Sequence, residues 1–274
     1  MPTIAIGEQE IYYTVQGSGD TLLIFPDNIH ASGAYAGEID YFSKRFRVLS
    51  FDYPATGRSS RDLKYQDERE FDLWNYRADL ACHLLQLLDV GASIVIGAGH
   101  GAWAALHFAG RQAKLHNLAV NGVIADSFLA SLDSRTLHRA LDTREHYYVR
   151  RADWLREQHG DDWRDVVDAD TLFLRRIADR GGYEVPDFVL NSIPCPVLLS
   201  GSLHDAFTPG LAQEFARISA LVPDCSIHLA GESGHPYGEE HPWMWTASDS
   251  FRQIADIFLS PDNHAERIAC VDRP

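Results

Sequence analysis

This sequence has few basic residues, no long apolar run and no leader of the secretory type. Lysine and arginine total 24 against 39 aspartate and glutamate residues, so the formal net charge is -15, and no basic cluster is longer than a pair such as Arg150 and Arg151. We therefore expect no nucleic-acid partner and no anionic-membrane partner. No stretch approaches the roughly 18 apolar residues of a membrane span, and no basic segment precedes an apolar one at the N-terminus, so we expect a soluble cytoplasmic protein.

Cysteine is sparse as well. The chain has four cysteines, widely separated and without C-x-x-C spacing: Cys82, Cys195, Cys225 and Cys270. This pattern argues against a zinc ribbon, a redox pair and a disulfide scaffold. We expect at least three of the four to be ordinary core residues, because free cysteine is among the most buried residue types. The sequence has no internal repeat, and its 274 residues suit one large α/β domain with an insertion.

The stretch from Ile94 to Trp103, Ile-Val-Ile-Gly-Ala-Gly-His-Gly-Ala-Trp, is the most informative part of the chain. Its apolar run predicts a strand, the glycines at every second position (Gly97, Gly99 and Gly101) predict a sharp turn, and the residues that follow predict a helix. The spacing is that of the G-x-S-x-G nucleophile elbow of α/β-hydrolases, in which the middle residue carries the attacking group. Here the middle residue is Gly99, so the frame of an elbow is present without its nucleophile.

Strands and helices alternate along the rest of the sequence. Apolar runs predict strands at residues 4–6, 11–15, 21–25, 47–51, 118–125, 196–200 and 226–229. Apolar residues at helical spacing predict helices at residues 35–46, 71–90, 102–109, 211–221 and 251–259. On the second of these helices we expect five leucines to face the core: Leu73, Leu80, Leu84, Leu87 and Leu88. Such alternation predicts a mainly parallel sheet that binds ligands beyond the carboxyl ends of its strands.

Together these landmarks resemble the α/β-hydrolase superfamily over residues 3–259. They follow one another in that family's order, at residues 25–28, 51–59, 94–103, 201–205 and 234–236. The resemblance implies an α/β-hydrolase fold: a mostly parallel eight-stranded sheet with helices on both faces and a helical cap. We expect the core at residues 1–126 and 191–260, the cap at residues 127–190, where charged and aromatic residues recur at helical spacing, and a loose tail at residues 261–274.

The same resemblance implies that Asp205 is the catalytic acid and His235 the catalytic base, in the chain order nucleophile position, acid, base. A neutral imidazole accepts a proton near neutral pH, and a carboxylate on its other nitrogen stabilises the cation that forms. The backbone N–H of His100, with one from Asp27 or Asn28, would form an oxyanion hole.

His30 and the side chain of His100 are further candidates for the pocket wall. Glu239, Glu240 and His241 follow His235 closely and are residue types that bind metals. Three such residues on a turn are more often solvated, so we expect no metal site and no cofactor.

Three explanations of Gly99 stay open. A serine was replaced to disarm an esterase, or the natural protein has lost hydrolysis, or the enzyme needs a base and an oxyanion hole but no covalent intermediate. Glycine relieves the strain of about 1 to 3 kcal/mol that another residue carries in a left-handed conformation. Gly99 therefore favours folding under each explanation.

The elbow is also similar to that of cofactor-independent dioxygenases of the same fold, which cleave 3-hydroxy-4-quinolone rings. Their Ser-His-Gly-x-Trp elbow matches residues 99–103 except at the serine, and residues 26–30 are similar too. This resemblance implies an acid after the sixth strand, where the chain has Asp126. Glycine at the nucleophile position is shared with the N-myc downstream-regulated family, whose members are non-enzymatic.

The sequence therefore favours an α/β-hydrolase-fold enzyme, or a nucleophile-lacking form of one, acting on a small apolar ester, lactone or ring carbonyl. The alternatives are a cofactor-independent dioxygenase or lyase with His235 as general base, and a catalytically silent binding protein. We expect a small-molecule substrate as the partner, and a homodimer stays open. We also expect Asp205 rather than Asp126 to pair with His235, and Gly99→Ser to install esterase activity.

Overall fold

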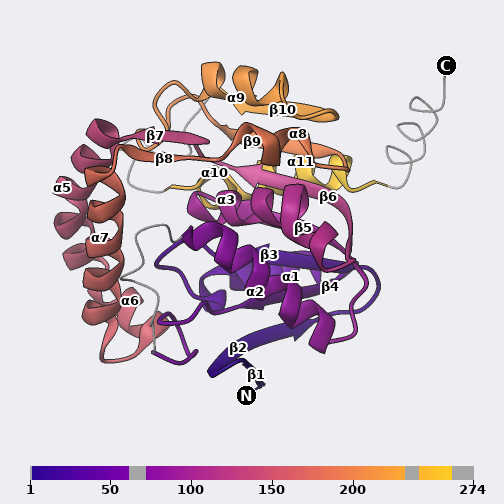
Figure 1. Cartoon of the computed structure of the whole chain (residues 1–274), viewed down its shortest axis with the longest axis horizontal. Helices are drawn as coiled ribbons and strands as arrows, with labels where there is room; N and C mark the ends of the chain where they lie inside the picture. Colours follow the sequence, from indigo (N-terminus) through magenta and orange to yellow (C-terminus); the bar gives the residue numbers. More distant parts are fainter. Residues whose placement is uncertain (1, 62–71, 232–240, 261–274) are drawn as a thin grey trace.

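The computed structural model describes residues 2–61, 72–231 and 241–260, and in this part of the chain eight strands form one sheet in the order β1-β2-β4-β3-β5-β6-β9-β10 (Figure 1). The β1–β2 and β2–β4 pairs are antiparallel, and every other neighbouring pair is parallel. The strands are β1 (Thr3–Ile6), β2 (Gln9–Gln16), β3 (Thr21–Phe25), β4 (Arg47–Phe51), β5 (Ala92–Ala98), β6 (Ala119–Asp126), β9 (Val197–Ser202) and β10 (Cys225–Ala230). The predicted mostly parallel, eight-stranded α/β-hydrolase sheet is confirmed.

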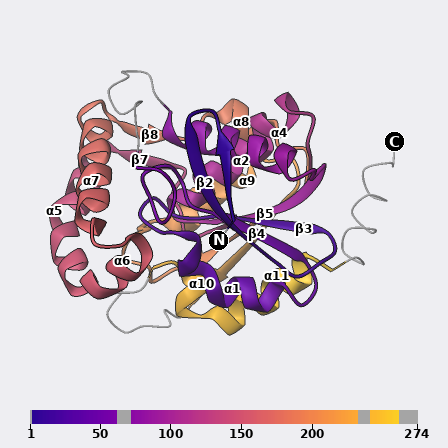
Figure 2. The same ribbon diagram turned by 90° about the horizontal axis from the view of Figure 1, so that it is seen from below.

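Helices cover both faces of this sheet, as Figure 2 shows. One face carries α2 (Leu73–Leu87), α3 (His100–His107), the π-helical turn η2 (Phe108–Gln112), α4 (Ala113–Leu115), α8 (Asp187–Asn191) and α9 (Leu211–Ser219). The other face carries the 3-10 turn η1 (Ser32–Tyr35), α1 (Ala36–Phe42), α10 (Trp243–Thr246) and α11 (Ser248–Phe258). No helix of the described segments is both long and apolar enough to cross a membrane.

Alternation along the strands produces two separate cores. In β3, Leu23 and Phe25 belong to the cluster under α2 and α3, whereas Leu22 and Ile24 belong to the cluster under α1 and α11. Successive side chains of a strand point to opposite faces, so a strand covered on both sides must be apolar throughout. This is why the central strands appear in the sequence as unbroken apolar runs.

The expectation for α2 was wrong in its details. The helix ends at Leu87 rather than Val90, and the side chain of Leu87 is 55% exposed. Leu73, Leu80 and Leu84 are buried as expected, and Leu88 is partly buried against the same core. The buried stripe also includes Ala81 and Leu85, neither of them more than 1% exposed, because alanine packs closely where a helix approaches a sheet.

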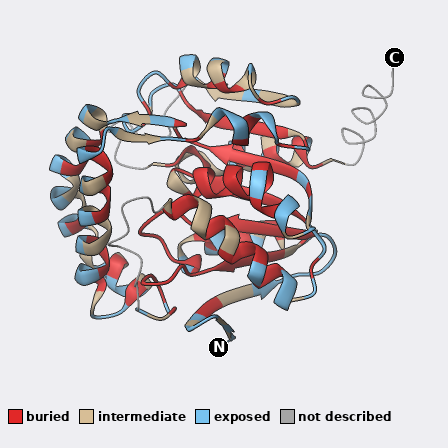
Figure 3. Ribbon diagram, viewed as in Figure 1, coloured by how far each residue is buried: buried red, intermediate tan, exposed pale blue. Residues whose placement is uncertain are grey.

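The segment between β6 and α8 stands at one end of the sheet. It contains α5 (Ser134–Arg150), α6 (Ala152–His159) and α7 (Trp163–Asp179), flanked by the antiparallel strands β7 (Ser131–Asp133) and β8 (Gly182–Glu184). Figure 3 shows that these helices are exposed on their outer sides and buried toward the rest of the chain. We refer to residues 127–186, the segment between β6 and α8, as the cap.

His159 fastens the cap to two loops of the sheet. Its Nδ1 accepts the backbone N–H of Gly57 at 2.8 Å, and its Nε2 lies 2.8 Å from the carbonyl oxygen of Ile29. An acceptor on one ring nitrogen and a donor on the other require the neutral tautomer. Burial lowers the pKa of His159, which favours the same neutral form.

Two of the four cysteines, Cys82 and Cys195, are buried and a third, Cys225, is partly buried; all three are free thiols. Burial raises the pKa of Cys82 and brings the pKa of Cys225 to about 11, so these thiols stay protonated and unreactive near neutral pH. Cys270 and the expected tail at residues 261–274 lie outside the described residues.

Candidate active site

The elbow between β5 and α3 has glycine at three positions. Gly99 has φ 56° and ψ −128°, in the region that other residues rarely adopt. A Cβ on Gly97 would lie 2.3 Å from the carbonyl oxygen of Gly101, and a Cβ on Gly101 would lie 2.4 Å from the carbonyl oxygen of Phe25. The outer glycines thus permit the close approach of strand and helix, and Gly99 permits the turn.

The carboxylate of Asp27, just after β3, lies beside the elbow. Its Oδ1 accepts the backbone N–H of Asn28 at 2.7 Å and that of His100 at 2.9 Å, and lies 3.0 Å from Nδ1 of His100. Its Oδ2 lies 2.8 Å from the point where a Cβ on Gly99 would stand. The backbone donors expected to form an oxyanion hole therefore already bind a carboxylate, and a side chain at position 99 would require that carboxylate to move.

Asp27 is ionised in this environment. Burial raises the pKa of a carboxyl group, but here the adjacent His100 outweighs burial by charge and hydrogen bonding, and His30 and His241 add to the effect. The net result is a pKa well below the usual range. The negative charge persists throughout the physiological pH range.

Hydrogen bonds with Tyr35, Trp74 and Arg77 fix the loop that carries Asp27. The backbone N–H of Asp27 donates to the hydroxyl of Tyr35 at 2.9 Å. The side-chain oxygen of Asn28 accepts hydrogen bonds from Nε1 of Trp74, at 3.2 Å, and from the guanidinium of Arg77. The Asn28 side chain therefore anchors the loop to α2, while the backbone N–H of Asn28 donates to Oδ1 of Asp27.

Among the described residues, the histidine that pairs with Asp205 is His241. Oδ2 of Asp205 lies 2.5 Å from Nδ1 of His241, and both side chains are largely buried, with exposures of 8% and 17%. His235 lies outside the described residues, so its own position stays a prediction. The chain order of elbow, acid and base is the same with His241 as with His235.

Each partner shifts the pKa of the other. Burial alone would lower the pKa of His241, but the Asp205 carboxylate, with Asp27 and Asp126 further away, raises it above its ordinary value. Burial would likewise raise the pKa of Asp205, and His241 lowers it instead. Asp205 thus fixes the tautomer of His241 and stabilises the imidazolium that forms when His241 accepts a proton.

Asp126 supports the site from within the core. Its carboxylate accepts the hydroxyl of Ser200 at 2.6 Å and the backbone N–H of Met244 at 3.0 Å, while the neighbouring Ser127 accepts the N–H of Trp243 at 2.7 Å. Met244 and Trp243 lie in the first turn of α10, directly after His241 and Pro242. Asp126 therefore anchors the segment that carries His241 and leaves the ring nitrogen of His241 to Asp205.

Asp126→Asn is expected to make the protein less sensitive to rising pH. Burial raises the pKa of Asp126 to about 6 from 3.8, so the folded state loses stability as the pH rises through this interval, by up to about 3 kcal/mol. An asparagine keeps one acceptor for Met244 and has no charge to bury. Urea unfolding at about pH 4 and about pH 7 should show that the free energy of unfolding falls less between these pH values in the variant than in the unchanged protein. An equal fall in both proteins would contradict a buried charge at Asp126. Asp249→Asn, at a 99% exposed side chain, is the control.

A cavity of about 380 Å³ opens above the elbow. Gly99, Asp27 and His241 line it together with residues of the cap, among them Leu137, Leu141, Tyr148 and Leu174. Most of the lining is apolar. The cavity therefore suits a small, mainly apolar molecule, which would contact both the elbow and the cap.

Two histidines on the cavity wall each have a ring nitrogen without a hydrogen-bond partner among the described residues. Within residues 2–61, 72–231 and 241–260, Nδ1 of His30 and Nε2 of His100 are buried and have no hydrogen-bond partner. The His30 ring contacts those of Trp154 and Trp245, with centroids 5.2 and 4.9 Å away, and burial lowers its pKa to about 4. His30 is therefore neutral near pH 7 and can donate or accept one hydrogen bond.

Two features of this site escaped the sequence analysis. His241 was considered only as a metal-type residue beside Glu239 and Glu240, both of which lie outside the described residues. A His-Pro pair occurs at 235–236 and again at 241–242, and this repetition is the signal that could have pointed to His241. The occupation of the oxyanion hole by Asp27 had no signal, because an aspartate after a strand commonly opens a turn.

The chain belongs to the alpha/beta hydrolase family, whose model matches residues 24–249. This membership agrees with the elbow and the sheet order described above.

Individual relatives are distant. A segment of 63 residues is 30% identical to a protein named as a carbamate hydrolase, RutD, in Azorhizobium caulinodans, and spans 23% of this chain and 24% of that protein. The enol-lactonase of Burkholderia xenovorans superposes with a TM-score of 0.66 at 17% identity over 94% of this chain and 100% of its own. Est816, described as an N-acyl homoserine lactone degrading enzyme, gives 0.67 at 16% identity over 94% and 100%. At these identities the structural likeness concerns the fold alone.

Proposed function

We propose that this protein is a hydrolase whose nucleophile is the carboxylate of Asp27 and whose general base is His241. The observation that carries the proposal is the placement of the Asp27 carboxylate, with Oδ1 bonded to two backbone N–H groups and Oδ2 2.8 Å from the Cβ position at residue 99. In an α/β-hydrolase that position belongs to the nucleophile. A second chain segment thus supplies an attacking oxygen where the elbow has none.

The charge on Asp27 selects the substrate class. An ester or lactone under attack develops an oxyanion that needs the backbone donors, and Oδ1 already occupies them with a negative charge. A saturated carbon that carries a halide, or that forms part of an epoxide, develops its charge on the leaving atom instead. We therefore propose a small, apolar halide or epoxide as the substrate.

For a halide the first step is a displacement. A lone pair of Oδ2 forms the new bond to carbon, the carbon–halogen bond breaks, and the halide departs with its electron pair, leaving an ester on Asp27. His30 lines the cavity, and its unpartnered Nδ1, when it carries the ring hydrogen and turns toward the cavity, can donate a hydrogen bond to the departing halide.

Hydrolysis of this ester completes the cycle. His241 takes a proton from water, and the hydroxide adds to Cγ of Asp27, so that negative charge develops on Oδ1 between its two backbone donors. The intermediate expels the alcohol oxygen, which takes the proton from His241. Asp27 then releases a proton to solvent. Overall, one organic halide and one water molecule give one alcohol, one halide ion and one proton.

Replacement of His241 should trap the ester. His241→Gln leaves the first step intact and removes the base of the second, so incubation with a short bromoalkane or a phenyl-substituted epoxide should add the organic group to Asp27, detectable by intact and peptide mass. His146→Gln, on the exposed side of α5, should turn over normally. His235→Gln tests the base expected from the sequence, and loss of activity in that variant but not in His241→Gln would overturn the proposal.

The pH dependence should identify His241. A base acts when neutral, so activity is expected to fall as the pH drops through a pKa raised above 6.5 by Asp205. Asp205→Asn removes that carboxylate, so the acidic limb should move to lower pH and kcat should fall about 10³- to 10⁴-fold. Steady-state kinetics across the pH range provides the measurement. If the acidic limb of the pH–activity profile does not move in Asp205→Asn, another group is the base.

Hydrolysis of a lactone or ester by water that His241 activates is the second candidate. It draws support from the two structural relatives that are described as acting on lactones, and it requires the Asp27 side chain to leave its backbone donors. A nitrophenyl ester and a small lactone therefore belong in the substrate panel. Oxygen uptake with a hydroxyquinolone would favour the dioxygenase alternative, and binding without turnover of any compound would favour a silent binding protein.

A further inference from the structure

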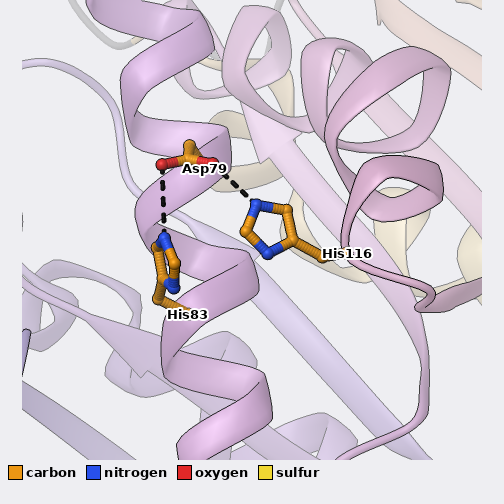
Figure 4. A group of neighbouring side chains, drawn as sticks. All are labelled: Asp79, His83 and His116. Carbon is orange, nitrogen blue, oxygen red and sulfur yellow. Dashed lines mark hydrogen bonds and ion pairs between the residues drawn. The ribbon is translucent and has the colours of Figure 1, made fainter.

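A second group of chemically active side chains lies away from the cavity. Asp79 and His83 are four residues apart on α2 and therefore share one face of the helix. His116, at the end of α4, points toward the same place, as Figure 4 shows. None of these three residues lines the cavity described above.

The three side chains converge on one small volume. Nε2 of His116 lies 2.7 Å from Oδ1 of Asp79, and Nε2 of His83 lies 3.5 Å from Oδ2 of the same carboxylate. One ligand atom from each residue can be chosen so that all three lie within 4.8 Å of one another. Ligand atoms of a tetrahedral zinc ion stand about 3.3 Å apart at bond lengths near 2.0 to 2.1 Å, so small side-chain rotations suffice.

The local backbone keeps the third ligand in place. The side-chain amide of Gln86, one turn beyond His83 on α2, donates to the carbonyl oxygen of His116 at 3.1 Å. The rings of His83 and His116 meet edge to face with centroids 4.7 Å apart. The turn after α4 is thus fastened to α2 independently of any metal, which lowers the entropy lost when a metal binds.

We propose that Asp79, His83 and His116 form a zinc site that joins α2 to the turn between α4 and β6. Two imidazoles and a carboxylate are the ligand types that zinc accepts, and the site is open enough for a water molecule to complete the tetrahedron, since His83 is 47% and Asp79 38% exposed. Its position away from the cavity gives the ion a role in stability. Hard cations such as Mg²⁺ prefer oxygen ligands and do not compete.

The chain offers a matched control for this site. His138 and Asp179 form an exposed histidine–carboxylate pair, 3.2 Å apart, on α5 and α7. Among the described residues, Asp79, His83 and His116 are the one group of three that could hold a metal. His138→Gln therefore removes a surface histidine with a carboxylate partner and leaves the proposed site intact.

The test is calorimetric zinc titration and thermal unfolding of the metal-free full chain. We expect one zinc per chain, unaffected by millimolar Mg²⁺, and a rise in Tm of about 5 °C at a zinc concentration of about 100 times Kd. His83→Gln, at an exposed side chain, and His116→Gln should each weaken binding at least about tenfold and abolish the rise. His138→Gln should retain both zinc binding and the rise in Tm. Co²⁺ in place of zinc should give the intense visible absorption of a tetrahedral site.

Several results would overturn this assignment. They are the absence of zinc binding, an unchanged Kd in both His83→Gln and His116→Gln, and an equal loss in His138→Gln, which would show that scattered surface histidines collect the metal.

Discussion

Asp27→Asn is expected to lower the turnover of a halide or epoxide substrate by about 10⁴-fold or more, the size of effect seen when a hydrolase loses its nucleophile. The amide oxygen can still accept the backbone N–H groups of Asn28 and His100, so the loop should keep its shape. The oxygen that attacks, Oδ2, is replaced by a group without a free charge. The unchanged protein in H₂¹⁸O should moreover acquire ¹⁸O at Asp27 in a single turnover, because water enters at Cγ.

A rise in ester hydrolysis on replacing Asp27 would be equally informative. If Asp27 only obstructs an oxyanion hole, then Asp27→Asn and Asp27→Ala should increase the hydrolysis of a nitrophenyl ester, because a negative charge leaves the place where the oxyanion forms. That outcome, with no ¹⁸O at Asp27, would refute the nucleophilic role. Asp162→Asn, at a partly exposed side chain paired with Arg61, is the control for loss of a loop carboxylate.

Gly99→Ser combined with Asp27→Ala is expected to create a serine hydrolase, whereas Gly99→Ser alone is not. A Cβ at position 99 would stand 2.8 Å from Oδ2 of Asp27, and a serine at φ 56° carries about 1 to 3 kcal/mol of strain. In the single variant the backbone N–H groups of Asn28 and His100 also remain occupied. Removing the carboxylate frees both donors and leaves room for Oγ beside His241.

The double variant should show a burst with an activated aryl ester and react with a serine-directed phosphonate at position 99, and the single variant should show neither. Mass spectrometry locates the label, and Asp27→Ala alone measures the background. Equal labelling of the single and double variants would contradict the idea that Asp27 blocks the elbow. This expectation differs from the one based on sequence, in which Gly99→Ser was sufficient.

Asp27 gives Gly99 a physical explanation. The space that a nucleophile side chain would need is filled from another loop, so glycine at the elbow and aspartate after β3 are complementary. A Cβ at position 99 would stand 2.8 Å from Oδ2 of Asp27, so a larger residue there requires the Asp27 side chain to move.

The order of strands and helices could be predicted from local patterns. Residues 21–25 and 47–51 were predicted as strands with the bounds of β3 and β4, because a strand buried on both faces is an unbroken apolar run. Gly97 and Gly101 of the elbow could be predicted equally well, since close backbone approach leaves no room for a side chain at either position. Leu87 shows where such patterns fail: which side of α2 meets the sheet depends on packing against partners distant in sequence.

The amino-acid sequence alone determined the α/β architecture, the elbow and the missing side chain at Gly99, because periodicity and glycine spacing act over a few neighbouring residues. Tertiary structure alone decided that Asp205 meets His241, that Asp126 anchors α10, and that the Asp27 carboxylate binds the backbone N–H of His100, 73 residues away. Each of these contacts joins segments that are far apart along the chain, and separation in sequence does not predict which segments are close in space. They form only where the carboxyl ends of parallel strands converge at one edge of the sheet.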